Sequence, residues 1–239
     1  MTLDELVTQL RTAYGPALRS VVLYGSAAAG GDEHVAKKSD YNVLIVVDDV
    51  PLDRLSELSS VTRAWRDAGN HPPMTFTERE WRSCSDIFAM EYADILERNK
   101  LLYGESPLNG ISVEHDDLRR QVEREAMGVL LRLRGAVLLA GTDSAEQIKL
   151  MTASLSTLMV VFRGILRIAG RKPPHGYAEI AKEVAAMAAI DASAFDAVAR
   201  QLRDSKAIPK ERAQQVLGAY LTGMEAVAMY VSALPNTRP

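Results

Sequence analysis

A glycine and a serine stand where one β-branched run ends, and an acidic residue stands shortly before the next run begins. Residues 19–24 lead into Gly25 and Ser26, and Asp40 precedes the second run at 42–47. A strand that ends in glycine and enters a helix directs backbone N–H groups at one point, and the serine adds a hydroxyl donor. A carboxylate nearby can ligate a hard cation such as Mg²⁺. These residue types therefore predict a site for a phosphate-bearing ligand, usually a triphosphate, and a metal ion.

Each of these residues also has an ordinary structural interpretation. Gly-Ser is common in strand–helix turns, and Asp40 could be a solvated residue that caps a turn. The strand-like runs on both sides and Ser39 directly before Asp40 favour the functional interpretation.

The sequence resembles the nucleotidyltransferase superfamily, of the DNA polymerase β and kanamycin nucleotidyltransferase type, over roughly residues 18–104. The resemblance rests on Tyr-Gly-Ser at 24–26, Ser-Asp at 39–40 and Leu-Leu-Tyr-Gly at 101–104. Members of this superfamily transfer a nucleoside monophosphate from a Mg²⁺-bound NTP to a hydroxyl of a drug, a nucleic acid or a protein. The resemblance implies Mg²⁺ as cofactor and an NTP, with ATP the first choice, as substrate. It implies a catalytic, metal-binding role for Asp40, metal or nucleotide binding by Asn42, and nucleotide binding by Gly25, Ser26 and Ser39.

Two positions depart from the family pattern. Asn42 stands where the family has a second carboxylate; its amide oxygen can coordinate Mg²⁺ but carries no charge to hold a second metal. Thr75, which we align with the third carboxylate, cannot act as a general base. Changes to residues that merely surround metal ligands already cost about 10–100-fold. We therefore expect transfer activity to be weakened or lost. The alternative is a non-catalytic protein on the same fold that binds a nucleotide or a partner.

Two further acids could replace a missing carboxylate. Asp86 and Glu91 lie in the segment 86–95, whose periodicity fits either a strand or a helix. In a strand Glu91 would share a face with apolar residues, whereas in a helix it would move to the surface. A carboxylate among apolar neighbours is either a functional acid or a paired structural one, and we favour the structural role.

Two arginines lie one helical turn apart in the apolar stretch 148–169. Arg163 and Arg167 could present two guanidinium groups to phosphates. The same spacing is typical of a solvated helix face, which is the interpretation we favour.

The pattern of apolar residues predicts two domains with different secondary structure. Residues 1–110 are expected to form an α/β (α+β) domain with a small mixed sheet, and residues 111–239 an all-α helical bundle. The expected elements of the first domain are helices at 2–14 and 52–68 and strands at 19–24, 42–47, 74–77 and 101–104. The bundle helices are expected to include 178–189, 193–203 and one opened by Pro209.

Composition limits the classes of partner. The net charge of −3 over 239 residues does not imply a broad nucleic-acid-binding face. The single cysteine, Cys84, excludes an intramolecular disulfide and suits a reducing compartment. Lys149 and the two arginines interrupt the apolar stretch 148–169, which argues against a membrane span. We expect a cytoplasmic protein that binds a nucleotide and a small-molecule or protein acceptor, without nucleic acid or membrane. A seam of small residues at 184–199 would suit a homodimer.

Overall fold

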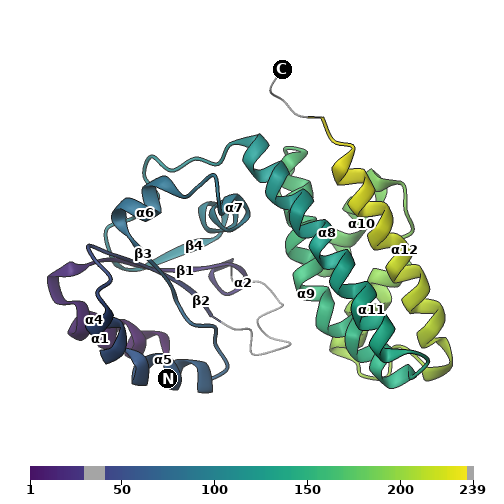
Figure 1. Cartoon of the computed structure of the whole chain (residues 1–239), viewed down its shortest axis with the longest axis horizontal. Helices are drawn as coiled ribbons and strands as arrows, with labels where there is room; N and C mark the ends of the chain where they lie inside the picture. The colour runs from purple at the N-terminus through teal and green to yellow at the C-terminus, as the bar shows by residue number, and fades with distance from the viewer. Residues whose placement is uncertain (30–40, 236–239) are drawn as a thin grey trace. The chain divides into compact units, whose positions relative to one another are not determined.

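The chain forms two compact units, Met1–Val113 and Glu114–Pro239, which are described separately. The structure is a computed structural model that describes residues 1–29 and 41–235 (Figure 1). The sequence analysis places the domain boundary at residues 110 and 111.

The N-terminal unit contains a mixed four-stranded sheet in the order β3-β2-β1-β4. β1 (Leu18–Tyr24) runs antiparallel to both β2 (Asn42–Val47) and β4 (Asn99–Gly104), while β2 runs parallel to β3 (Met74–Thr77). A small mixed sheet followed by a helical region was predicted from the sequence, and the structure confirms this α+β organisation.

Helices cover both faces of this sheet, which is why its two central strands are almost wholly apolar. Because side chains alternate along a strand, Val43, Ile45 and Val47 of β2 face one helical layer and Leu44 and Val46 face the other. The first layer consists of α1 (Leu3–Tyr14), α4 (Leu52–Glu57) and α5 (Ser59–Asp67), and the second of α6 (Glu78–Ser83) and α7 (Ala89–Glu97) (Figure 1).

The capping sequences explain where several helices begin. Thr2 and Glu5 form a capping box at the start of α1. Thr77 and Glu80 form a second capping box, so α6 begins directly after β3. Helix α6 was not predicted from the sequence, although the Thr-x-x-Glu pattern of a capping box is present at its start. The sequence also predicted one helix at 52–68, whereas the structure divides this segment into α4 and α5 at the buried Leu58.

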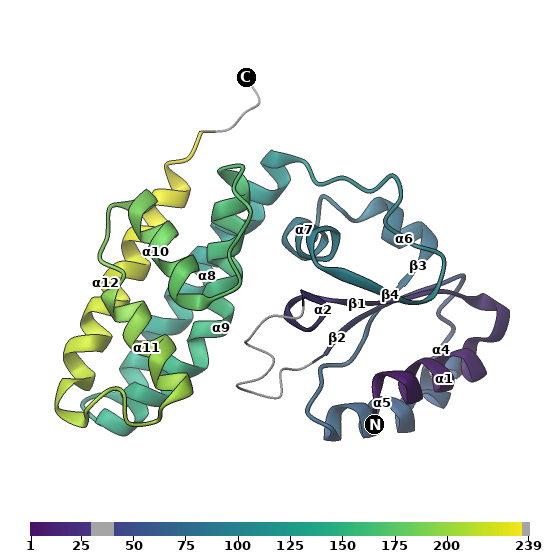
Figure 2. The same cartoon turned by 180° about the vertical axis from the view of Figure 1, so that it is seen from behind.

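The C-terminal unit is a bundle of helices built around α9 (Ser144–Ile168), as Figure 2 shows from behind. α9 packs against each of the other long helices, so it is apolar around much of its circumference. Asp143 caps it through hydrogen bonds accepted from the N–H groups of Ala145 and Glu146. The other helices are α8 (His115–Ala140), α10 (Tyr177–Ala188), α11 (Ser193–Arg203) and α12 (Ala213–Ser232).

The length and apolar composition of α9 would by themselves allow it to cross a membrane, and in the described part of the chain it alone meets that test. Half of its apolar window is buried inside the structure.

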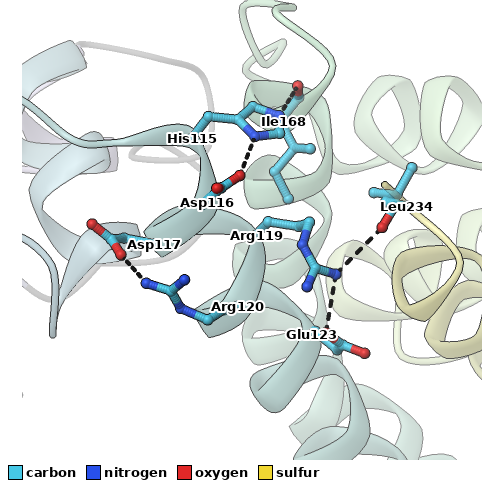
Figure 3. A network of polar contacts seen from close by, with 8 residues as sticks. All are labelled: His115, Asp116, Asp117, Arg119, Arg120, Glu123, Ile168 and Leu234. Carbon is cyan, nitrogen blue, oxygen red and sulfur yellow. Dashed lines mark hydrogen bonds and ion pairs between the residues drawn. The ribbon is translucent and has the colours of Figure 1, made fainter. Parts of the chain in front are cut away.

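A polar network joins the ends of three bundle helices (Figure 3). At the start of α8, His115 Nε2 donates a hydrogen bond of 3.2 Å to the carbonyl oxygen of Ile168 at the end of α9. The buried Arg119 donates from Nη1 to Glu123, 3.1 Å away, and to the carbonyl oxygen of Leu234 after α12, 3.5 Å away. This network therefore satisfies carbonyl groups that helix ends leave without intrahelical partners.

The small-residue seam at 184–199 is exposed only in part. Val184 and Ala185 of α10 and Ala194, Phe195 and Val198 of α11 are buried within the bundle. α10 and α11 pack on each other and on α9, so the buried residues belong to the bundle core. The dimer surface at this seam stays a prediction.

Gly223 on α12 provides a test of the bundle core. A Cβ atom there would lie 2.8 Å from Phe195 Cζ, and the Phe195 ring is held between Phe162 and Tyr220. Gly223→Ala should therefore lower the free energy of unfolding by about 1–3 kcal/mol through overpacking. On the same helix Gly218 faces open space, so Gly218→Ala should be neutral or stabilise by up to about 1 kcal/mol. Urea denaturation measures both; equal effects would contradict the packing at Phe195.

The raised pKa of Tyr220 predicts how the free energy of unfolding depends on pH in the alkaline range. Burial raises its pKa to about 12, although its hydrogen bond with Ser154 acts in the opposite direction. The folded state therefore favours the neutral phenol, and this stabilisation is complete below pH about 10, the pKa of an unfolded tyrosine, and is lost as pH rises towards 12. Tyr220→Phe should reduce the fall in the free energy of unfolding by on the order of 2 kcal/mol over that pH range. Denaturant titrations between pH 9 and 11.5 test this; identical slopes for the two proteins would contradict it.

Candidate functional site

Gly25 ends β1 and turns the chain into the short helix α2 (Ser26–Ala29). Its φ of +78° lies in the left-handed region that side chains disfavour. Its N–H donates to the carbonyl oxygen of Arg98, 3.0 Å away, and its own carbonyl accepts from Ala28 N–H, 3.2 Å away. The sequence predicts that N–H groups at this turn are directed at a ligand. The Gly25 N–H instead donates its hydrogen bond within the protein.

The register between β1 and β2 brings Asn42 to this turn. Tyr24 is paired directly with Asn42, so both side chains lie on the face of the sheet that α7 covers. A Cβ atom on Gly25 would lie 3.2 Å from Asn42 Nδ2. The two ends of an amide are assigned from their surroundings, so either the oxygen or the nitrogen of Asn42 can face the turn.

Asp94 of α7 lies near Gly25 on the face of the sheet that α6 and α7 cover. Its Oδ2 would lie 3.5 Å from a Cβ on Gly25, while its Oδ1 accepts a hydrogen bond from Nη2 of Arg98. The Arg98 side chain is only 8% exposed and that of Asp94 is 23% exposed. Arg98 therefore holds the turn through two hydrogen bonds: its carbonyl oxygen accepts from the Gly25 N–H, and its guanidinium donates to Asp94.

Asp94 was not among the residues predicted from the sequence. The available signal was its spacing from Glu91, since residues three apart share a helix face. That signal could be used only once the segment was known to be helical.

Burial and the carboxylates of α7 together raise the pKa of the Tyr24 phenol. Burial is the larger cause, followed by the charges of Glu91 and Asp94, and the pKa rises to about 12. The charge of Glu91 therefore acts on the Tyr24 phenol, and the Glu91 side chain is half-buried. Of the two interpretations of 86–95 that the sequence leaves open, the structure shows the helix over 89–97, where Glu91 is partly exposed. Asp86 is exposed in the segment before α7.

Thr75 does not approach Asn42. It is paired with Ile45, whose side chain packs in the core on the α1 side of the sheet, so Thr75 points to the face opposite Asn42. On the α7 face β3 presents Met74 and Phe76. β3 therefore contributes no carboxylate to the candidate site.

Three of the predicted groups lie outside the described part of the structure: Ser39, Asp40 and the side chain of Ser26. Asp40 stands two residues before Asn42 in the sequence.

Arg163 and Arg167 belong to the C-terminal unit. Arg163 is buried, with its guanidinium carbon 5.7 Å from the centre of the Tyr177 ring, a cation–π distance. Arg167 is half-buried. The favoured interpretation of a solvated helix face is therefore wrong for Arg163.

A hollow of about 480 Å³ lies between α8 and α9, lined by apolar residues such as Leu133 and Leu150 and by Arg132 and Lys149. Lys149 is paired with Glu146 at 3.2 Å, and both side chains are more than half exposed. We place the candidate site at Gly25 instead, because buried and half-buried polar side chains converge there from three elements.

The donor set at Gly25 suits a particular kind of metal binding. Asp94 and Asn42 offer oxygen ligands, which Mg²⁺ prefers. Within residues 1–29 and 41–235 no group of three or more His, Cys, Asp or Glu side chains is arranged to hold a metal. Mg²⁺ commonly binds through one or two carboxylates together with substrate phosphates and water. The residues present therefore fit a metal ion that arrives with a phosphate ligand, rather than a cage made by the protein alone.

Comparison with known proteins adds no family assignment. No protein-family model matches the sequence, and no curated protein is significantly similar to it. The function must therefore be argued from the site itself.

Proposed function

We propose that the N-terminal unit is a nucleotidyltransferase-like domain that binds an NTP, ATP in the first place, as its Mg²⁺ complex. The observation that carries this proposal is the convergence of Asn42 and Asp94 on Gly25, the glycine of the Tyr-Gly-Ser motif. In this proposal Asp40 and Asn42 hold the metal, and Ser26 and Ser39 contact the nucleotide.

The chemistry would be transfer of a nucleoside monophosphate from the NTP to a hydroxyl of a small molecule or a protein, with pyrophosphate as the leaving group. Bound Mg²⁺ would neutralise charge on the phosphates. Arg98 would hold the Asp94 carboxylate in place, and Asp94 or Glu91 would have to accept the proton of the acceptor hydroxyl, because β3 supplies no carboxylate.

The position of Thr75 favours a second candidate function, which is nucleotide binding without turnover. A residue on the opposite face of the sheet cannot serve as a base at Gly25, so transfer would be weakened or lost while the binding residues remain. In either form we propose a cytoplasmic protein, and a homodimer stays compatible with it.

Calorimetric titration of ATP with and without Mg²⁺ tests the proposal without knowledge of the acceptor. We expect micromolar binding that requires Mg²⁺, and we expect Asp40→Asn to weaken it by removing a charged ligand. The titration is repeated with GTP and CTP. Absence of heat with all three nucleotides would refute the proposal and direct attention to the helical bundle.

A comparison of Gly25→Ala with Gly69→Ala distinguishes two effects of an added Cβ: damage to the nucleotide site and strain in the backbone. Both glycines have positive φ, +78° and +91°, but a Cβ on Gly69 meets nothing within 4 Å. Both variants should lose roughly 1–2 kcal/mol of stability through left-handed strain. Gly25→Ala should in addition displace Asn42 or Asp94 and weaken Mg²⁺–ATP binding roughly tenfold, the effect of one good polar contact. Equal ATP affinities for the two folded variants would place the nucleotide site elsewhere.

A further inference from the structure

We infer that the hollow between α8 and α9 binds a small anionic amphiphile, a molecule with an apolar body and one carboxylate group. This site is independent of the nucleotide site proposed above, because it belongs to the C-terminal unit and uses none of the same residues.

The hollow results from small residues at facing positions of two antiparallel helices. α8 and α9 are joined by the short turn at 141–143, and the lining residues of each helix recur at spacings of three and four, so each helix contributes one continuous face. Ala136 and Ala140 of α8 and Ala153 of α9 lie on these faces, where larger side chains would fill the space between the helices. A volume of about 480 Å³ lies within the usual range of small-molecule sites.

The walls of the hollow are largely apolar. Among the lining residues Val129 and Leu133 are buried, whereas Leu139 is 91% exposed. The hydroxyl of Ser154, which also lines the hollow, is engaged with the buried Tyr220 hydroxyl at 3.1 Å. The apolar body of a ligand would therefore meet apolar surface, and its burial together with that of Leu139 would favour binding.

Two arginines of α8 share one carboxylate beside the hollow. Within residues 1–29 and 41–235, Arg132 approaches the carboxylate of Glu125 alone, with Nη2 4.0 Å from Oε2, and Arg124 approaches the same carboxylate at 3.6 Å. A separation of 4.0 Å is too long for a hydrogen bond, so the Arg132 guanidinium can donate two N–H groups to a ligand carboxylate.

The remaining charges of the lining balance each other. Lys149 and Glu146 form an ion pair at 3.2 Å, which leaves Arg132 to set the sign of the ligand. The charge at the hollow therefore favours an anion over a neutral molecule or a cation.

Calorimetric titration of the full chain with octanoate, and with octan-1-ol as its neutral counterpart, tests the site. We expect octanoate to bind to the wild type, and Ala153→Phe to weaken binding of both compounds roughly tenfold or more by filling the hollow. Ala219 is also exposed but lies on α12 away from the hollow, so Ala219→Phe should leave both affinities unchanged. Ala140→Leu fills the hollow from α8 and supplies the answer if Ala153→Phe does not fold.

Arg132→Gln tests the class of ligand. Removal of this charge should weaken octanoate binding roughly three- to fivefold, the usual contribution of an exposed ion pair, and leave the affinity for octan-1-ol unchanged. Arg134→Gln removes the same charge from a position of α8 that does not line the hollow, where Arg134 is paired with Glu225 at 2.8 Å. It should leave both affinities unchanged.

The outcomes distinguish the site from the class of its ligand. Absence of octanoate binding to the wild type, or wild-type affinity in a folded variant that fills the hollow, overturns the site. An Arg132→Gln variant that loses affinity equally for both compounds, or for neither, overturns the anionic ligand. A loss confined to octanoate and to Arg132→Gln supports the inference. Nucleotide binding at Gly25 is measured separately with ATP, so failure of the proposed function would be recognised independently.

Discussion

The register between β1 and β2 is the constraint on which the N-terminal unit depends. Pairing Tyr24 with Asn42 places both side chains under α7 and sends Val43, Ile45 and Val47 to the opposite core. A slip of one residue would turn every side chain to the other face, exposing the core and removing Asn42 from the turn. The same alternation, carried through the parallel pairing of β2 with β3, directs Thr75 away from the site. One register thus determines the hydrophobic packing and the composition of the site together.

Arg98 connects the two layers that form the site. Its carbonyl oxygen fixes the left-handed turn at Gly25, and its guanidinium holds the carboxylate of α7 that faces the turn. A buried charge is stable only with a partner, so Arg98 and Asp94 depend on each other.

The elements were largely predictable where local signals were strong. The helix expected at 2–14 and the strand expected at 42–47 rest on signals contained in a few neighbouring residues, and the structure confirms them. The segment 86–95 was ambiguous because short apolar runs fit two periodicities, and packing of Tyr92 and Ile95 against the sheet decided for a helix. Arg163 looked solvated because spacing alone cannot show that other helices surround α9 on most sides.

By itself, the sequence determined the order of strands and helices, the glycine at the turn and the lack of carboxylates at Asn42 and Thr75, since these are properties of residue type and local spacing. Only the tertiary structure decided that Asp94 lies at the turn and that Thr75 faces away from it. These facts depend on strand register and on the packing of α7 across the sheet. Contacts between residues about 70 positions apart, such as Gly25 with Asp94, arise when apolar faces are buried against each other, and no local pattern of residues specifies them.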